Sequence, residues 1–314
     1  MTITLRQLSY FKALAQQRNF SRAALACNVS QPALSVQIRE LEAALNGPLI
    51  ERHARDAVLT PFGRQVLDVA DRVLGEVAGL EQAARRRGGM AGRLALGVIP
   101  TIAPYFLPEV LEALRSRDIS LDVAVTEAKT DRLLDLLAEG ALDACVIALP
   151  LTRDGITALP LFEDRFLLAG SAGRLDLYPE APHPEGLGEA QLLLLEDGHC
   201  LTDQALAVCG RGRGHARINM AASSLATLSR LVEAGFGLTL IPEIALRTET
   251  RNAADLHLRR FAVPEPSRSV CLARRGTASE PGWFTDLAAI LSAVGAQLIA
   301  EARQTLPDAV GRAD

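Results

Sequence analysis

The stretch FSRAALACNVSQPALSVQIRELE, residues 20–42, decides how the chain begins to fold. Ser21 is a good N-cap for a short helix over residues 22–27. Asn28 can take a left-handed conformation in the turn that follows. Ser30 then has the right chemistry to cap a further helix. The stretch therefore predicts two helices joined by a tight turn.

The helix after the turn presents small, hydrogen-bonding or cationic side chains outward. Pro32 is tolerated in its first turn because those N–H groups lack helical partners. With an amphipathic helix over residues 5–16, the pattern indicates a helix-turn-helix whose polar groups can enter a DNA major groove. The same face also fits the solvated side of an ordinary helix bundle, and this alternative stays open. The outward residues are Ser30, Gln31, Ser35, Gln37 and Arg39.

Charge is distributed unevenly along the 314 residues. Eight basic and four acidic residues up to Arg64 give that segment +4, which leaves −8 for the rest of a chain with a total of −4. A basic head on an acidic body suits a nucleic-acid-binding head with a different task behind it.

Residues 63–84 are strongly helical, with an apolar residue every three or four positions. Such a seam fits packing against the identical helix of a second subunit, although packing on its own domain is the alternative. A hinge is expected at residues 85–89. The seam is formed by Val66, Val69, Ala70, Val73, Val77, Leu80 and Ala84.

From Arg93 onward, short apolar strands alternate with helices, which predicts parallel α/β layers. Strands are expected over residues 94–99, 121–125, 144–149, 166–169, 192–195, 218–221, 238–241 and 270–273. Helices are expected over residues 106–115, 131–139 and 283–300.

Composition limits the class of protein. No run of about 18 apolar residues occurs, and the N-terminus lacks the layout of a signal peptide, so we expect a cytoplasmic protein with no membrane partner. The five cysteines form no CxxC pair and no zinc-spaced Cys/His cluster. We therefore expect no metal and no cofactor. Cys27, Cys145 and Cys271 fit buried free thiols.

The segment over residues 20–42 resembles the signature of the LysR family of transcriptional regulators. Residues 48–52 and 59–63 resemble the segments that enter and leave that family's wing, and residues 231–242 resemble a hallmark of its effector domain. One departure is Asn46-Gly47, where the family usually has a glycine directly after the leucine. Asn46 can adopt a positive φ, so the helix end is expected to survive.

The resemblance implies an α/β protein: an all-α winged helix-turn-helix with a linker helix, then a two-lobed α/β regulatory domain of periplasmic-binding-protein type. The implied divisions are a DNA-binding domain over 1–63, a linker over 64–91, a regulatory domain over 92–303 and a tail over 304–314. Lobe I would take 92–165 and 268–303, and lobe II 166–267. DNA contacts would come from Ser21, Ser30, Gln31, Pro32, Ser35, Gln37, Arg39, Arg52 and Arg55. The implied partners are a duplex DNA operator, a homodimer that assembles into a homotetramer, and RNA polymerase.

Residues 192–209, LLLLEDGHCLTDQALAVC, contain two cysteines at a predicted strand-to-helix junction. Cys200 lies where the helix begins, and the helix dipole and free N–H groups stabilise a thiolate there. His199 could add charge or a hydrogen bond, whereas Asp197 and Asp203 oppose this. The sign of the pKa shift at Cys200 therefore stays open at this point.

This segment resembles the OxyR branch of the LysR family, which responds to hydrogen peroxide. The resemblance implies that Cys200 is the peroxidatic and Cys209 the resolving cysteine of an activator of oxidative-stress genes. It also implies a peroxide pocket formed by Thr101, Thr130, His199 and Asp203. Thr202, Ser229 and residues 210–214 depart from the branch's usual pattern, which bears on reaction rate and redox poise.

The spacing of the cysteines bears on the mechanism. A helix would separate the two Cα atoms by roughly 13 Å, whereas a disulfide needs about 5.5 Å. A bridge would therefore require the segment to unwind. The alternative is a pair of inert thiols on a buried helix.

Two rival functions remain at this stage. The first is a LysR regulator that binds a small organic effector between its lobes, which would need an accessible cleft and no dependence on Cys200. The second is a thiol peroxidase, for which no reductant site is evident and the DNA-binding head would be idle. A non-enzymatic regulator is the expectation.

Overall fold

The computed structural model describes residues 3–52, 56–85, 93–117, 121–151, 153–187, 192–210, 221–276 and 282–307. The chain divides into two compact units, one containing Met1–Arg85 and the other Arg86–Leu137 and Leu142–Asp314. Of the predicted features, Arg55, most of the hinge over residues 85–89 and most of the strand over 218–221 lie outside the described residues.

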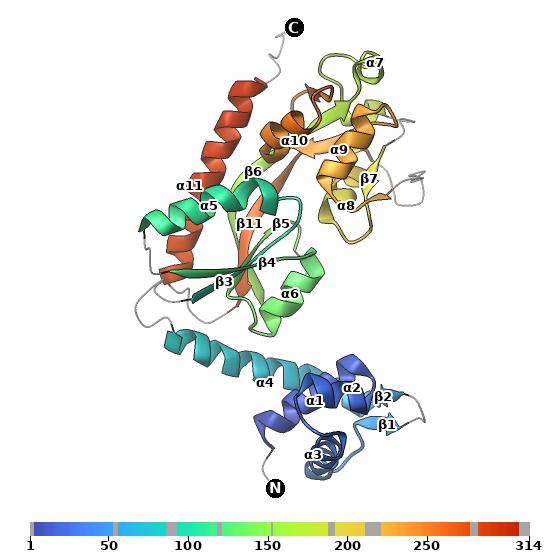
Figure 1. Cartoon of the computed structure of the whole chain (residues 1–314), viewed down its shortest axis with the longest axis vertical. Helices are drawn as coiled ribbons and strands as arrows, with labels where there is room; N and C mark the ends of the chain where they lie inside the picture. Colours follow the sequence, from blue (N-terminus) through green and yellow to red (C-terminus); the bar gives the residue numbers. More distant parts are fainter. Residues whose placement is uncertain are drawn as a thin grey trace. The chain divides into compact units, whose positions relative to one another are not determined.

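The first unit is a three-helix head with a two-stranded wing and a long helix (Figure 1). Its elements are α1 (Leu5–Gln17), α2 (Phe20–Ala26), α3 (Gln31–Ala44), β1 (Ile50–Arg52), β2 (Ala57–Leu59) and α4 (Pro61–Arg85). Strands β1 and β2 pair antiparallel, with Glu51 opposite Val58. Fully buried Phe11 on α1, Ala23 on α2 and Leu34 on α3 join the three short helices into one core.

Local signals in the head are largely confirmed. The Ser30 hydroxyl accepts a hydrogen bond from the Ala33 amide at 3.3 Å and caps α3. Asn28 and Asn46 both have positive φ, at 53° and 54°.

The predicted cap at Ser21 is wrong, because Asn19 caps α2. Its side-chain oxygen accepts from the amides of Ser21 and Arg22 at 3.0 and 3.1 Å. Asparagine is as good an N-cap as serine, so the helix begins at Phe20, one residue beyond this competing cap.

The predicted outward orientation of Ser35 is also wrong. Its exposed fraction is 8%, because it lies three residues before the core residue Ile38 and therefore on the flank of the same helix face. Ser21, Ser30, Gln31, Pro32 and Arg39 are exposed, and Gln37 is half-buried.

The apolar seam of α4 divides into two sets. Val66 and Ala70 pack on the core of the head. Val69, Val73 and Leu80 are exposed, with exposed fractions of 48%, 38% and 71%.

The second unit contains a seven-stranded mixed sheet, with β10-β6-β11-β5-β3-β4 in order and β9 beside β6. Strands β3, β4 and β5 are parallel, as predicted, but the long strands β6 and β11 run antiparallel to each other, and β11 runs antiparallel to β5. The strands are β3 (Arg93–Val98), β4 (Asp122–Glu127), β5 (Ala144–Ala148), β6 (Ile156–Gly170), β7 (Leu194–Leu195), β8 (Ala221–Ala222), β9 (Thr239–Pro242), β10 (His257–Arg260) and β11 (Ser267–Arg275).

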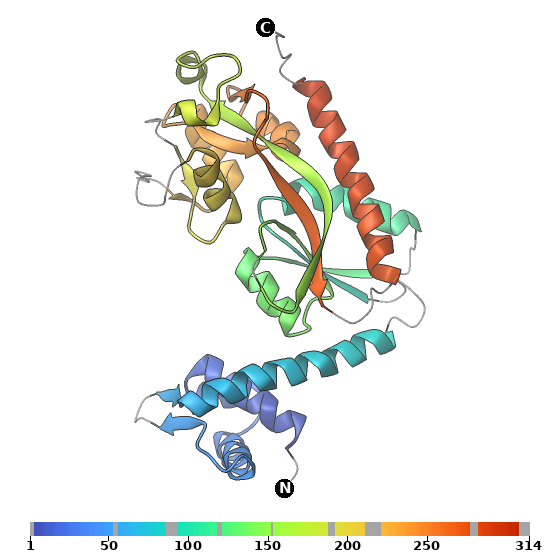
Figure 2. The same ribbon diagram turned by 180° about the vertical axis from the view of Figure 1, so that it is seen from behind.

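Two lobes share the long strands β6 and β11, which run from one lobe into the other (Figures 1 and 2). Lobe I consists of β3, β4 and β5 with helices α5 (Ala103–Arg117), α6 (Thr130–Ala138) and α11 (Gly282–Thr305). Lobe II contains β7 to β10 with α7 (Ala172–Leu175), α8 (Cys200–Val208), α9 (Leu225–Glu233) and α10 (Leu246–Asn252). The chain thus passes between the lobes on two adjacent strands.

One described helix, α11, is long and apolar enough to cross a membrane by length and composition alone. Leu287 and Leu291 on this helix are fully buried in the core of the second unit, together with strand residues such as Val146 and Leu272. The helix is thus accounted for as a core element of lobe I.

Candidate functional site

The segment around the two cysteines begins where β7 ends at Leu195. A short loop leads to His199, the N-cap of α8, and Cys200 is the first residue of the helix. The Thr202 hydroxyl donates to the Leu195 carbonyl at 2.9 Å, which ties the first turn of α8 back to the strand. Thr202 therefore has a local structural role at the start of α8.

Cys209 is the C-cap of α8, so the helix between the cysteines is intact. All five cysteines are free. An α-helix rises about 1.5 Å per residue, which puts the two Cα atoms roughly 13 Å apart, well beyond disulfide reach. The structure thus has the separated arrangement that the spacing predicts for the reduced state.

The Cys200 thiol lies in a largely apolar environment beside a buried cation. Burial raises the pKa of this thiol above its ordinary value, while the positive charge of Arg268, the Thr130 hydroxyl and the backbone N–H groups at the helix start lower it. Burial is the largest of these effects, so the shift that the sequence left open is upward. Arg268 is then the main group that favours the thiolate once it forms.

Arg268 is the centre of a buried network that joins β11 to β6 and to the loop after β3. Its guanidinium donates to Asp164 at 2.8 and 3.0 Å, to the Thr101 hydroxyl at 2.9 Å and to the Thr101 carbonyl at 3.2 Å. Sequence reasoning missed Arg268, because an arginine two residues before the strand predicted over residues 270–273 gives no sign of burial. The only available signal was its place among the charged residues that flank that strand.

Of the two threonines predicted for the pocket, Thr101 lies in this network and Thr130 lies at the Cys200 thiol. Thr101 is buried and accepts from Arg268. Thr130 begins α6, and its buried hydroxyl lies at the Cys200 thiol, whose pKa it lowers as a hydrogen-bond partner. A hydroxyl can donate one hydrogen bond and accept others, so it can also bind a small polar molecule beside the thiol.

The other two predicted pocket residues differ in their placement. His199 is buried, and burial together with the charge of Lys129 lowers its pKa, so the imidazole is neutral at pH 7. Asp203 is exposed on the first turn of α8, where its charge is favourable to the helix dipole. Asp203 is therefore not one of the buried groups around Cys200.

The remaining cysteines are less accessible to chemistry. Burial raises the pKa of both Cys145 and Cys271 to about 12, and both are fully buried on adjacent strands. Burial also raises the pKa of the Cys27 thiol in the head. Unlike the pKa of Cys200, the pKa values of these three thiols are raised with no positive charge or hydrogen bond from the described residues that lowers them, which makes them poor nucleophiles at neutral pH.

A cavity of about 180 Å³ adjoins the thiol site, and Thr101 and His199 both line it. Tyr105 and Glu249 line it too, and the Tyr105 hydroxyl donates to Glu249 at 2.6 Å. The volume is below the roughly 300–1,000 Å³ of typical organic-ligand pockets, which disfavours the organic-effector alternative.

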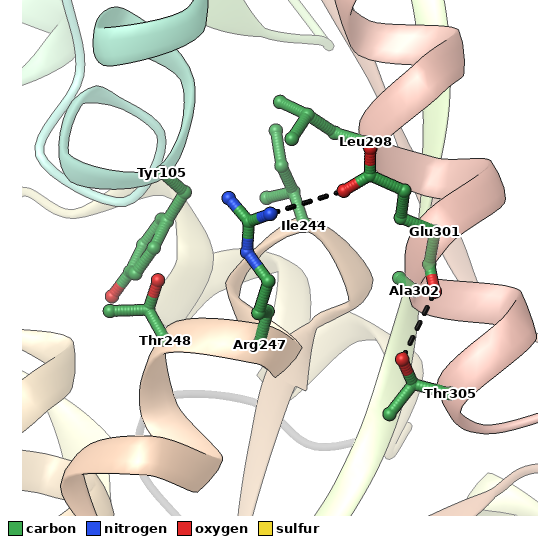
Figure 3. A pocket seen from close by; sticks show the side chains of 8 residues that line it. All are labelled: Tyr105, Ile244, Arg247, Thr248, Leu298, Glu301, Ala302 and Thr305. Carbon is green, nitrogen blue, oxygen red and sulfur yellow. Dashed lines mark hydrogen bonds and ion pairs between the residues drawn. The ribbon is translucent and has the colours of Figure 1, made fainter.

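A second, smaller pocket of about 30 Å³ is also lined by Tyr105 (Figure 3). Arg247 on α10 reaches across it to Glu301 on α11 at 3.1 Å, and it also contacts Glu109 on α5 at 2.8 Å. Because α10 belongs to lobe II and the other two helices to lobe I, these ion pairs tie the lobes together.

The candidate DNA interface is the exposed face of α3. Gln31 and Arg39 are exposed there, and Gln37 donates to Glu40 at 2.8 Å. Val36, which sequence reasoning missed, has an exposed fraction of 42% and offers an apolar group for a thymine methyl. Arg52 lies on strand β1 of the wing.

Comparisons with known proteins cover both units. The family described as "Bacterial regulatory helix-turn-helix protein, lysR family" matches residues 5–64, and "LysR substrate binding domain" matches residues 87–294. A probable hydrogen peroxide-inducible genes activator from Streptomyces viridosporus is 42% identical over 92% of this chain and 93% of its own length. The DNA-binding transcriptional dual regulator OxyR of Escherichia coli K12 is 38% identical over 87% of this chain and 90% of its own.

Solved structures agree with these matches. A full-length OxyR variant from Pseudomonas aeruginosa has a TM-score of 0.67 and 32% identity, covering 93% of this chain and 97% of its own. A hydrogen-peroxide-bound OxyR mutant from Corynebacterium glutamicum has a TM-score of 0.63 and 33% identity, covering 97% of this chain and 98% of its own. The chain belongs to the LysR family of bacterial transcriptional regulators and, within that family, to the OxyR group.

Proposed function

We propose that this protein is a cytoplasmic, DNA-binding transcription activator that responds to hydrogen peroxide through Cys200 and Cys209. The observation that carries the proposal is the position of Cys200. It lies at the start of an intact helix, beside buried Arg268 and the Thr130 hydroxyl, with Cys209 at the far end of the same helix. The names of the relatives support a role in the peroxide response.

The chemistry takes two balanced steps. The Cys200 thiolate attacks one peroxide oxygen, the O–O bond breaks, and the other oxygen leaves as water after protonation, which gives a sulfenic acid. The Cys209 thiol then attacks the Cys200 sulfur, and the sulfenic oxygen leaves as a second water with the formation of the disulfide. Because α8 keeps the cysteines apart, the second step requires the helix to unwind.

Several buried groups suit the first step. Arg268 favours the thiolate over the thiol. Thr130 at the Cys200 thiol and Thr101 at Arg268 offer hydroxyls to orient a peroxide molecule. His199 is neutral, so it can donate or accept a single hydrogen bond without adding charge.

The expected test is peptide mapping of the full-length protein after a low dose of peroxide. One new bridge should link Cys200 to Cys209. The other three cysteines should stay as thiols, because Cys200, unlike them, has a cation and hydrogen-bond donors that oppose the effect of burial on its pKa. A bridge from Cys200 to any other cysteine would contradict the mechanism. It would favour the alternative, a LysR regulator that binds a small organic effector between its lobes.

DNA binding is proposed for α3 and the wing. The predicted contacts other than buried Ser35 are retained: Ser21, Ser30, Gln31, Pro32, Gln37, Arg39, Arg52 and Arg55. The exposed Val69, Val73 and Leu80 on α4 support a dimer in which two such helices pack together. Assembly to a tetramer and contact with RNA polymerase belong to the same proposal.

Gln31→Ala should impair discrimination between operator and random DNA. Gln31 is exposed at the first position of α3, where a side-chain amide can read an adenine edge, and such a contact is worth about 1–3 kcal/mol. Binding isotherms on the two DNAs at fixed salt measure the ratio. Gln17→Ala is the matched control, because Gln17 is exposed on α1, away from the recognition helix. An unchanged ratio for Gln31→Ala would remove it from the reading residues.

A further inference from the structure

The loop that leads into Cys200 is fastened to lobe I by one lysine. Lys129 directly precedes α6, and its ammonium lies 2.7 Å from a carboxylate oxygen of Glu196 in lobe II. It also donates to the backbone carbonyl of Asp197 at 2.8 Å. The second contact holds the main chain itself, so the path of the loop, and not only a side chain, depends on Lys129.

Close packing supports the same attachment. Gly198 has a φ of +91°, which favours glycine, and a Cβ there would lie 3.1 Å from Cδ of Lys129. The backbone of the loop therefore lies directly on the methylene stem of Lys129. The contact thus has an ionic part at Glu196, a hydrogen bond at Asp197 and a packing part at Gly198.

The attachment lies beside the proposed redox centre. Lys129 is adjacent in sequence to Thr130, whose hydroxyl acts on the Cys200 thiol, and Gly198 is two residues before that cysteine. The charge of Lys129 also helps to keep His199 neutral. Lys129 thus holds the start of α8 against the groups of lobe I that contact Cys200.

Among the described residues, other ties between the lobes are made by other elements. Arg247 joins α10 to α5 and α11, and Arg268 joins β11 to β6. Gln204 donates to the Leu149 carbonyl at 3.0 Å, but Gln204 belongs to α8, the helix that must itself unwind. Loss of the Lys129 contacts would therefore loosen the attachment of the loop to lobe I without separating the lobes. Within lobe II the Glu196 amide would still donate to the Ala222 carbonyl at 2.9 Å.

We propose that Lys129 is a positioning residue that holds the 196–199 loop in the reduced state and must release it before Cys209 can reach Cys200. This inference rests on the proposed function. Lys129 would then set the rate of the bridging step separately from the rate of peroxide attack. Neither the identity of the reacting cysteines nor the DNA-binding head predicts such control.

The test compares Lys129→Gln with Lys129→Arg in the full-length protein. In Lys129→Gln, amide hydrogen exchange over residues 196–201 of the reduced protein should be faster. Conversion of the Cys200 sulfenic acid to the disulfide should be about 1.4- to 5-fold faster, the range expected for one partly exposed ion pair. Lys129→Arg keeps the charge and should restore most of the parent behaviour. Quenching with a thiol-alkylating reagent followed by mass spectrometry measures the bridging rate, and Cys209→Ser isolates the sulfenic step.

The chain offers a closely matched control in Arg153. Its pair with Asp135 has the same 2.7 Å separation, and the exposed fractions of the two side chains are 36% and 47%, against 37% and 47% for Lys129 and Glu196. Arg153→Gln should leave both the exchange and the bridging rate unchanged. Arg247→Gln breaks a different tie between the lobes and should not speed exchange of the loop.

The outcomes separate this inference from the function on which it rests. Unchanged exchange in Lys129→Gln, or an equal effect in Arg153→Gln or Arg247→Gln, would overturn the attachment. Faster exchange with an unchanged bridging rate would overturn its control of the second step. A parent protein that forms no bridge would refute the proposed function, and with it the control of bridging, while the exchange data would still decide whether Lys129 holds the loop.

Discussion

Cys200→Ser should reduce the peroxide response to background in a reporter assay. A serine hydroxyl cannot become a sulfenic acid, so neither chemical step can occur. The substitution replaces sulfur by a smaller oxygen at the start of α8, a position where serine is compatible with the helix. The reduced protein should therefore fold and bind DNA like the parent, which the same DNA isotherms and circular dichroism would check.

Two further variants define that result. Cys209→Ser should still accumulate a sulfenic acid at Cys200, detectable with a sulfenic-acid-specific reagent, but should form no bridge between these residues. Cys271→Ser should respond like the parent, because burial raises the pKa of that thiol to about 12. A full transcriptional response in Cys200→Ser would exclude the cysteine mechanism.

Asp164→Ala should lower the free energy of unfolding by about 3–5 kcal/mol. The side chains of Asp164 and Arg268 are both fully buried, so removing the carboxylate leaves a guanidinium without a counter-charge inside the protein. It also removes the acceptor for the Ile244 amide, at 3.0 Å. Urea unfolding of the full-length protein, monitored by circular dichroism, measures the loss of stability in the second unit.

Asp135→Ala provides the comparison for that loss. Asp135 pairs with Arg153 at 2.7 Å, but both side chains are partly exposed, so the expected cost is at most about 1 kcal/mol. If Asp164→Ala does not fold, Asp164→Asn keeps an acceptor for Ile244 and should fold with an intermediate loss of stability. Equal costs for Asp164→Ala and Asp135→Ala would show that the buried pair does not stabilise the reduced fold as argued.

The sequence predicted those features that local signals determine. The cap at Ser30 and the left-handed residues Asn28 and Asn46 depend only on their neighbours, and all three are confirmed. The same local reasoning was wrong at Ser21, because Asn19 two positions earlier offers an equivalent cap. Local sequence alone does not show which of the two residues, Asn19 or Ser21, is the N-cap of α2.

Features that depend on distant residues were missed. Only residues 166–169 of β6 were predicted as a strand, because Pro160 and the charged residues Glu163 and Asp164 interrupt the apolar pattern. Asp164 is buried there only because Arg268, more than a hundred residues later, neutralises it. Lys129 was missed for the same reason, since its partners lie in another lobe.

For the cysteines, the sequence and the resemblance together predicted the separated pair, and the structure supplied the groups around it. The intact helix between Cys200 and Cys209 follows from local sequence. The upward pKa shift at Cys200 depends on burial, which the segment alone could not supply.

The buried face of α8 bears on how long the oxidised form lasts. Leu201 and Leu206 are buried in the reduced protein, and exposing both on unwinding would cost about 3–6 kcal/mol. That cost is subtracted from the stability of the disulfide and would raise its reduction potential by roughly 60–130 mV. A disulfide that forms only by unfolding a packed helix is more readily reduced by cellular thiols. The packing of α8 that stabilises the reduced protein would therefore also shorten the lifetime of the oxidised protein.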